Sequence, residues 1–563
     1  MTIPHFDTRH LRDCLPARNG GWYYLDASGR SDVHSIMLNP GYRKRTIFLL
    51  LALLLVRFWF GQTFELSGQE AYLWLQGHGA NLNPSYWERG PFVPLLIRIG
   101  TTFFGDTELG VRWLAAVICC SSGFVLFYLA RHWFDARTAF WSVVLFIIVP
   151  MFAWKLSFMT EAAASIGLMA LTMFAFCMAI ERDKVWWWLL GGTACGLALL
   201  VALPNAWWIA GLLLYFAVSG ERTHRLREAL LWSTIIFTSF FLLPIVWWWR
   251  GPQVAELAHT RIINAWPLSH PFSFTQGVHF IGLEIYTLCP LFAALLLFVM
   301  WRLGRELWED PRYGLLVCLA VPGLIWQNFA AFFSEGRFEL VPALFLPMIL
   351  LAGCFLARLT RTDLMARWIC GTVLIVATVQ TLAGLNPYYV DTKANGHGYR
   401  LRRTQSAENM TNYFDASQRQ VSWRNLADAI QILQRDVGAT LIIADTPETA
   451  AALSFYLPRN PFVYVQSKPD TITHFDFWPG YDQSATPNDS ALYLTHESAE
   501  HPAEPPSAAL TKDFAEVSRV EDPPLPDFDK GWEIWNCQHF VGSGQGPAEI
   551  PTEPMPEHDA LPK

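Results

Sequence analysis

Long apolar runs recur along the sequence between Thr46 and Leu385. Most have about 18 to 22 residues, the length that an α-helix needs to cross a hydrocarbon core of roughly 30 Å. Apolar residues make up 52% of the chain and charged residues only 16%, a balance that excludes an ordinary soluble protein. We predict an α-helical polytopic membrane protein with about 11 transmembrane helices, at residues 46–64, 112–130, 138–154, 162–180, 185–202, 204–219, 229–249, 278–301, 313–333, 340–357 and 368–386.

Basic residues are distributed unevenly between the connections. Arg43, Lys44 and Arg45 precede the first span, and the short connections after even-numbered spans carry most of the other basic loop residues: Arg131, Arg137, Arg182, Lys184, Arg222, Arg225, Arg227, Arg302, Arg305, Arg312, Arg358, Arg361 and Arg367. The positive-inside rule then places the N-terminus in the cytoplasm. The connections at 65–111, 155–161, 250–277 and 334–339 are predicted to face outward, together with everything after the last span.

The predicted domains follow from this topology. Residues 1–45 form a cytoplasmic tail, 46–386 the membrane domain with its first periplasmic loop at 65–111, and 387–540 a periplasmic α/β domain. In that last domain, "WRNLADAIQILQRD" and "TPETAAALSFYL" have the patterns of helices, whereas "ATLIIAD", "PFVYVQ" and "SALYLTH" have the patterns of strands. Residues 541–563 are rich in Pro and Glu, which is typical of disorder.

Charge and cysteine patterns exclude several classes of function. The net charge of −7 comes with no polybasic arm, so we expect no nucleic-acid partner. Only Cys537 of the ten cysteines lies in the C-terminal domain, and no CxxC spacing occurs, so we expect neither a disulfide in that domain nor a cysteine metal site. The histidines His259, His270 and His279 fit no metal-binding spacing.

Ionisable residues collect in the outward connections. The first of these carries "GQEAYLW" and "SYWERGPFVPLL", which we expect to lie along the membrane interface as amphipathic helices. A carboxylate at this depth can take the proton of an acceptor hydroxyl, and an arginine can stabilise a departing phosphate. The pattern makes a phosphate-bearing lipid a plausible partner, and its candidate residues are Glu70, Glu88, Arg89, Lys155, Glu161, Glu335 and Arg337.

The succession of "LSGQEAYLW", "YWERGPFVPLL", "FGDTELGVRWLAA" and "MTEAA" resembles the protein O-mannosyltransferase and lipid A aminoarabinose transferase family, glycosyltransferase family 39 of the GT-C fold. The resemblance covers most of residues 46–386, and the outer segments "LSFYLPRNPFVYV" and "HFDFWPGYD" are similar to those of bacterial members. It implies a polyprenyl-phosphate sugar as donor, inversion at the anomeric carbon, and transfer without a metal or another cofactor. It also implies a bacterial inner-membrane location and an acceptor hydroxyl on a lipid, a glycan or a protein.

The family's site residues map onto specific positions here. Its acidic pair after the first span falls on Gln69 and Glu70, so an amide replaces the expected catalytic aspartate. The resemblance assigns the base to Glu70 or Glu161, and phosphate binding to Arg89 and Arg337. The alternative is a non-catalytic polyprenyl-phosphate lipid binder or transporter that retains the fold.

Simpler interpretations accompany these assignments. Glu70 and Glu161 can be interface carboxylates paired with arginines, and Arg89 can bind lipid headgroups. We expect Arg57 to extend its head to the interface, with a role at the donor phosphate as the alternative. Arg112, at the start of the second span, either anchors the protein structure or takes part in binding a ligand. Glu284, in the eighth span, needs a partner or a wet cavity, and with Gln69, Glu88 and Arg57 it completes the supporting candidates.

Overall fold

The chain divides into two compact units. The computed structural model describes residues 14–16, 22–24, 40–78, 90–182, 184–218, 229–241, 243, 246, 271–303, 310–333, 340–362, 364–385, 423–466, 473–496, 505–521 and 532–542. The first unit comprises Met1–Glu65, Gln76–His78 and Pro84–Gln418, and the second comprises Leu66–Leu75, Gly79–Asn83 and Arg419–Lys563. The second unit therefore joins a short segment after the first span to the C-terminal part of the chain.

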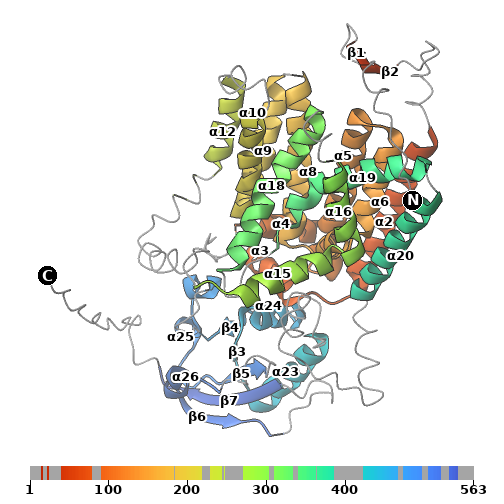
Figure 1. The fold of residues 1–563 in the computed structure, drawn as a ribbon. Helices are drawn as coiled ribbons and strands as arrows, with labels where there is room; N and C mark the ends of the chain where they lie inside the picture. Colours follow the sequence, from red (N-terminus) through yellow and green to blue (C-terminus); the bar gives the residue numbers. More distant parts are fainter. Residues whose placement is uncertain are drawn as a thin grey trace, which may run out of the picture. The chain divides into compact units, whose positions relative to one another are not determined.

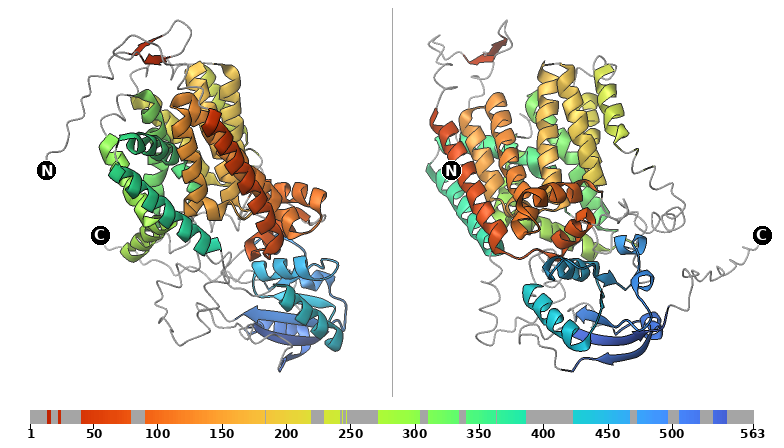
Figure 2. Two further views of the ribbon diagram at one scale, coloured as in Figure 1. Left: turned by 90° about the vertical axis from the view of Figure 1, so that its right-hand side faces the viewer. Right: turned by 180° about the vertical axis from the view of Figure 1, so that it is seen from behind.

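The first unit is a bundle of helices (Figure 1, Figure 2). Its described helices are α2 (Pro40–Thr63), α4 (Phe92–Phe104), α5 (Glu108–Trp133), α6 (Ala136–Ile148), α7 (Pro150–Lys155), α8 (Glu161–Arg182), α9 (Val185–Val201), η2 (Leu203–Ala206), α10 (Trp207–Val218), α12 (Ala229–Phe240), α15 (Phe274–Thr287), α16 (Pro290–Leu303), α18 (Pro311–Ala331), η3 (Pro342–Phe345), α19 (Leu346–Thr362) and α20 (Leu364–Leu385). A short antiparallel pair, β1 (Cys14–Pro16) and β2 (Trp22–Tyr24), precedes them.

Five of the described helical segments are long and apolar enough to cross a membrane: Gly41–Thr63, Glu108–Trp133, Glu161–Arg182, Pro311–Ala331 and Pro342–Leu359. A bent pair, α15 with α16, makes a sixth if it is one span. The chain is thus a multi-pass membrane protein, as predicted. The number of eleven spans stays a prediction.

Two predicted spans are not continuous helices. The span predicted at 138–154 is divided between α6 and α7, and α7 begins with Pro150. The span predicted at 278–301 bends by 95° between α15 and α16. Pro290 explains this break, because proline has no N–H to donate and disfavours helical geometry in the residue before it. That residue, Cys289, has a φ of 69°.

Small residues bring the helices of this unit close together. A Cβ on Gly353 of α19 would lie 2.1 Å from the Ser142 Oγ of α6, and one on Gly211 of α10 would lie 2.5 Å from the Cys318 carbonyl oxygen of α18. Inside a bilayer the hydrophobic effect does not drive helices together, because the lipid tails are themselves apolar. Close contacts at small residues instead hold the helices together through dispersion forces. Large buried side chains fill the spaces between them, among them Phe146, Phe152, Phe176, Trp188, Trp208 and Phe292.

The second unit contains a five-stranded sheet in the order β4-β3-β5-β7-β6. Its strands are β3 (Leu441–Ala444), β4 (Tyr464–Val465), β5 (Ala491–His496), β6 (Phe514–Arg519) and β7 (Trp532–Phe540). β3 is parallel to β4 and β5, whereas β7 is antiparallel to β5 and β6. Its helices are α23 (Trp423–Val437), α24 (Pro447–Tyr456), η5 (His474–Phe477), α25 (Tyr481–Ser484) and α26 (Ala508–Asp513).

The sequence prediction of this α/β domain is confirmed. All three predicted strands and both predicted helices are present, and the Thr446 side chain caps α24 by accepting the Thr449 N–H at 3.3 Å. The sequence reasoning did not identify β6 and β7. In β6 most side chains are exposed or half-buried, so the strand has little of the apolar signal used to find the others. Of the tail predicted at 541–563, residues 543–563 lie outside the described residues, and the periplasmic placement of the domain stays a prediction.

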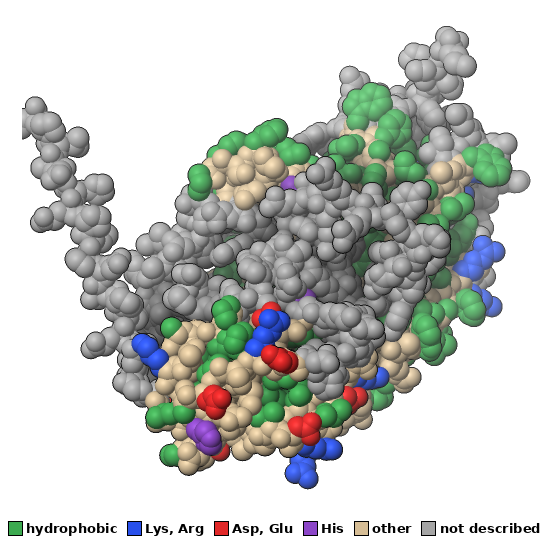
Figure 3. Space-filling view, turned by 90° about the horizontal axis from the view of Figure 1, so that it is seen from below, with side chains coloured by type: hydrophobic (Ala, Val, Ile, Leu, Met, Phe, Trp, Pro, Cys, Tyr) green, Lys and Arg blue, Asp and Glu red, His purple; other side chains and the backbone are tan. Residues whose placement is uncertain are grey.

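Figure 3 shows one face of the molecule, on which acidic and basic side chains are interspersed with apolar ones. The described surface on this face has both signs of charge side by side.

Candidate functional site

Glu70 belongs to a capping box at the start of α3 (Gly68–His78). The Ser67 N–H and the Ser67 hydroxyl both donate to Glu70 Oε2, each at 3.1 Å, and the Glu70 N–H donates back to Ser67 Oγ at 3.3 Å. The carboxylate is completely buried. Glu70 therefore has a structural function in satisfying the first amides of the helix, whatever its role in catalysis.

Gln69 lies next to Glu70 in the first turn of α3 and is half-buried. Its amide cannot act as a base at neutral pH, but it has both a donor and an acceptor for hydrogen bonds. A supporting role for Gln69 stays a prediction.

Glu161 is the first residue of α8 and is half-buried. Negative charge is favourable at a helix N-terminus because the helix dipole is positive there. The neighbouring Thr160 hydroxyl is buried and has no hydrogen-bond partner among the described residues. A carboxylate and a hydroxyl thus stand together at this helix end, which suits contact with a hydroxyl-bearing substrate.

Arg57 fixes the segment that leads to Glu161. Its Nη1 donates to Ser157 Oγ at 3.0 Å and its Nη2 to the Ala153 carbonyl oxygen at 3.1 Å. The side chain is only 8% exposed. The guanidinium thus has acceptors inside the protein, and its position relative to the membrane interface stays a prediction. A supporting role in the site stays a prediction.

Arg112 is an anchor for the end of α2. Its Nη1 donates to the Phe64 carbonyl oxygen at 2.6 Å and its Nη2 to that of Glu65 at 2.7 Å. The guanidinium lies 5.3 Å from the centre of the Phe158 ring, and the side chain is 2% exposed. Of the two interpretations of Arg112, the anchor is the one that these contacts support.

Arg57 and Arg112 together bring distant parts of the first unit to one place. Both come from membrane helices, and both contact the segment between α7 and α8, at Ser157 and Phe158. The segment that carries Lys155 and ends at Glu161 is thereby held against α2 and α5. The position of Glu161 thus depends on buried charged groups from two other helices.

Glu284 is buried in α15, at 8% exposure, and its Oε2 has no hydrogen-bond partner among the described residues. The nearby Asn328 of α18 donates its amide to the Leu324 carbonyl oxygen at 3.0 Å. A supporting role in catalysis stays a prediction.

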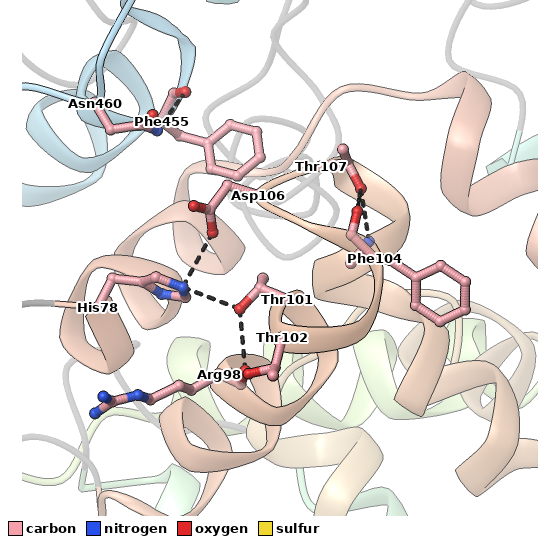
Figure 4. Close-up of polar contacts among 10 residues, drawn as sticks. His78, Arg98, Thr101, Thr102, Phe104, Asp106, Thr107, Phe455 and Asn460 are labelled. Atoms are coloured by element: carbon pink, nitrogen blue, oxygen red, sulfur yellow. Dashed lines mark hydrogen bonds and ion pairs between the residues drawn. The ribbon is translucent and has the colours of Figure 1, made fainter.

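His78, at the end of α3, contacts two side chains through one ring nitrogen (Figure 4). His78 Nε2 lies 3.0 Å from Asp106 Oδ1 and 2.9 Å from Thr101 Oγ1. The Thr101 hydroxyl also lies 3.1 Å from the Arg98 carbonyl oxygen, to which it can donate. These contacts fix the last turn of α3 to the α4–α5 connection.

Sequence reasoning missed three of these features: the capping role of Glu70, the anchor at Arg57 and the contacts of His78. The first had a signal in the sequence, because Ser67-Gly68-Gln69-Glu70 has the Ser-x-x-Glu spacing of a capping box. The other two depend on partners far along the chain.

Four predicted residues lie outside the described residues, so their assignments stay predictions: Glu88, Arg89, Glu335 and Arg337. The adjacent Gly90 is described, and a Cβ there would lie 1.7 Å from the Leu200 carbonyl oxygen. The backbone next to Arg89 thus approaches the end of α9 closely. Within the described residues, no group of three His, Cys, Asp or Glu side chains could hold a metal ion.

Comparisons with known proteins agree with this architecture. The family described as "Dolichyl-phosphate-mannose-protein mannosyltransferase" matches residues 88–249. Over 87% of its length, the chain superposes on the crystal structure of ArnT from Cupriavidus metallidurans bound to undecaprenyl phosphate, with a TM-score of 0.56, 18% identity and coverage of 97% of that chain. The chain has the GT-C fold. The predicted resemblance to glycosyltransferase family 39 is confirmed with it.

Two curated relatives are named as sugar transferases. The lipid A galacturonosyltransferase RgtD of Rhizobium johnstonii is 21% identical over 254 residues, which are 45% of this chain and 52% of RgtD. An undecaprenyl phosphate-alpha-4-amino-4-deoxy-L-arabinose arabinosyl transferase of Pseudomonas aeruginosa is 25% identical over 308 residues, 51% of this chain and 53% of that protein. This GT-C chain thus aligns with about half the length of these relatives.

Proposed function

We propose that this protein is a membrane glycosyltransferase that transfers a sugar from a polyprenyl-phosphate donor to an acceptor hydroxyl. The observation that carries the proposal is the fold match to ArnT, which includes 97% of a structure with undecaprenyl phosphate bound. The names of the two relatives, both sugar transferases, support it. The site is assigned to the periplasmic face of a bacterial inner membrane, from the uneven distribution of basic residues.

The reaction needs a base and a cation. The base, Glu70 or Glu161, takes the proton of the acceptor hydroxyl while its oxygen attacks the anomeric carbon. The bond from that carbon to the phosphate oxygen breaks, and the electron pair leaves with the phosphate. Arg89 and Arg337 stabilise the charge that develops there. Attack opposite the leaving group inverts the anomeric centre.

The structure makes Glu70→Gln a sharp test of the base. Glutamine also closes a capping box, so this variant keeps the helix start and loses only the ionisable group. Glu70→Ala removes both, and the lost cap costs about 0.5 to 2 kcal/mol of stability. Transfer of radiolabelled sugar to a membrane extract, from a panel of synthetic polyprenyl-phosphate sugars, is measured for the wild type, both Glu70 variants and Glu161→Gln.

If Glu70 is the base, Glu70→Gln lowers kcat by about 10²- to 10⁴-fold at an unchanged unfolding temperature, and Glu161→Gln has a smaller effect. If Glu161 is the base, the two variants exchange these results. Near wild-type turnover in both Gln variants would remove both carboxylates from the role of base.

A non-catalytic lipid binder is the second candidate, and Gln69 favours it because an amide stands where the family resemblance expects the catalytic aspartate. The capping role of Glu70 favours it too, since that role explains a buried carboxylate without catalysis. Saturable binding of the donors by the wild type, with no label transferred to any extract, would establish this candidate and overturn the transferase.

A further inference from the structure

The segment that carries Gln69 and Glu70 is packed into the C-terminal lobe, the part of the second unit from Trp423 to Gly542. Residues Leu66–Leu75 group with this lobe, whereas Gln76–His78 group with the membrane helices. The Leu66 N–H donates to the Tyr456 hydroxyl of α24 at 2.7 Å. A Cβ on Gly68 would lie 2.8 Å from the Glu448 Cβ, also of α24. The start of α3 therefore rests directly on α24.

Aromatic side chains extend this contact along α3. The Tyr72 ring stacks on Phe475 with centroids 5.9 Å apart and planes inclined by 8°, and the His474 N–H donates to the Tyr72 hydroxyl at 3.1 Å. Trp74 meets Phe455 edge to face, with centroids 4.9 Å apart. Tyr72 and Trp74 are 2% and 3% exposed. One face of α3 is thus a buried interface with the lobe.

The lobe residues that receive α3 are themselves held in place. Thr473 and Asp476 form a capping box around η5, and Phe462 and Trp478 pack on Phe475. The Arg424 guanidinium of α23 lies over the Tyr456 ring of α24, 5.8 Å from its centre. The lobe thus presents fixed partners to α3.

The contacts form an unbroken series from the lobe to the carboxylate. Tyr456 fixes the Leu66 amide, the next residue is Ser67, and Ser67 holds the Glu70 carboxylate through its N–H and its hydroxyl. Loss of the Tyr456 hydroxyl frees the peptide that immediately precedes the capping box. A shift of this segment by a fraction of an ångström moves both Gln69 and Glu70.

We propose that the C-terminal lobe is the positioning platform of the acidic segment Ser67–Glu70, with Tyr456 as the positioning residue. This inference rests on the proposed transferase function. It assigns the lobe a part in turnover itself. A small misplacement of reacting groups is costly to the rate even when binding is unaffected.

Tyr456→Phe tests the proposal, because it removes the hydroxyl that accepts from Leu66 and keeps the ring under Arg424. Tyr481→Phe is the matched control: it also removes one phenol hydrogen bond in the lobe, from Tyr481 to Asp513 Oδ2 at 2.7 Å, without touching α3. Hydrogen exchange of residues 64–75 and steady-state transfer are measured for the full-length protein and both variants in lipid nanodiscs.

We expect Tyr456→Phe to speed exchange of the Leu66 amide and to lower kcat about ten- to hundredfold, with the KM for the donor unchanged. Tyr481→Phe leaves both quantities at wild-type values. Equal losses of kcat in the two variants, or unchanged hydrogen exchange of the Leu66 amide in Tyr456→Phe, would overturn the proposal that the lobe positions Ser67–Glu70.

The two proposals fail in different ways. A wild type that transfers no sugar overturns the transferase, and the exchange measurement then decides by itself whether the lobe holds the segment. A wild type that transfers sugar while Tyr456→Phe keeps full kcat overturns the positioning role and leaves the transferase standing.

Discussion

Arg112 and Arg57 are both buried arginines whose charged groups contact acceptors inside the protein. Each uses two guanidinium nitrogens on acceptors inside the first unit, and neither reaches open solvent. A buried guanidinium needs acceptors for its donors, and each of these two has acceptors at both terminal nitrogens, while Arg57 Nε has none among the described residues. The carbonyls that it satisfies depend on it in turn, so these residues are part of the fold.

Arg112→Gln should therefore destabilise the protein. The shorter amide cannot serve both Phe64 and Glu65, and a buried carbonyl left without a donor costs roughly 1 to 3 kcal/mol. We expect a clear fall of the thermal unfolding temperature in detergent. Arg98→Gln, at an exposed position of α4, is the control and should stay within about 0.5 kcal/mol of wild type. Equal unfolding temperatures for the two variants would contradict the anchor.

At the scale of elements, helix pairs meet through glycine. The contact of α6 with α19 has no room for a methyl group at Gly353, which faces Ser142. At Gly371 of α20, in contrast, no heavy atom of the described residues lies within 4 Å of a built Cβ. Gly353 is thus tightly packed against a neighbouring helix, whereas Gly371 has open space, within the described part of the chain, where a side chain would be.

Gly353→Ala should destabilise the bundle, because overpacking a close contact costs about 1 to 3 kcal/mol. Gly371→Ala should be neutral or stabilising by about 0.5 to 1 kcal/mol, since alanine is the better helix former. Thermal unfolding of both variants in the same detergent measures the difference. A Gly353→Ala variant at least as stable as Gly371→Ala would show that the α6–α19 contact is not close.

At the scale of the whole molecule, the distribution of basic residues predicts which parts face outward. The prediction places the lobe on the periplasmic side and the connection after α8 in the cytoplasm. Val541, in the lobe, is 69% exposed, and Arg182, at the end of α8, is exposed as well. Each position therefore reports on one side of the membrane.

A membrane-impermeant maleimide should label Val541→Cys in intact spheroplasts, and Arg182→Cys only after the membrane is permeabilised. The native cysteines should add little labelling of their own. The nine whose surroundings the structure describes are all buried, and Cys14→Ser removes the tenth. Labelling of Arg182→Cys in intact cells, with Val541→Cys protected, would reverse the topology.

Features with a local cause were predictable from the sequence. Hydropathy identified the membrane helices, period-two and helical patterns identified β3, β4, β5, α23 and α24, and Thr446 marked a helix start. The resemblance to glycosyltransferase family 39 had the same basis, since its motifs are short and contiguous. Apolar periodicity and capping act over a few residues, so neighbours in the chain are sufficient to specify them.

Only the tertiary structure decided where the polar groups of the candidate site find their partners. Leu66 and Tyr456 are separated by 390 positions, Tyr72 and His474 by 402, and Arg57 and Ser157 by 100. No local pattern relates such residues. Their pairing results from burial, because a polar group taken out of water requires a partner, and the folded chain alone determines which partner is within reach.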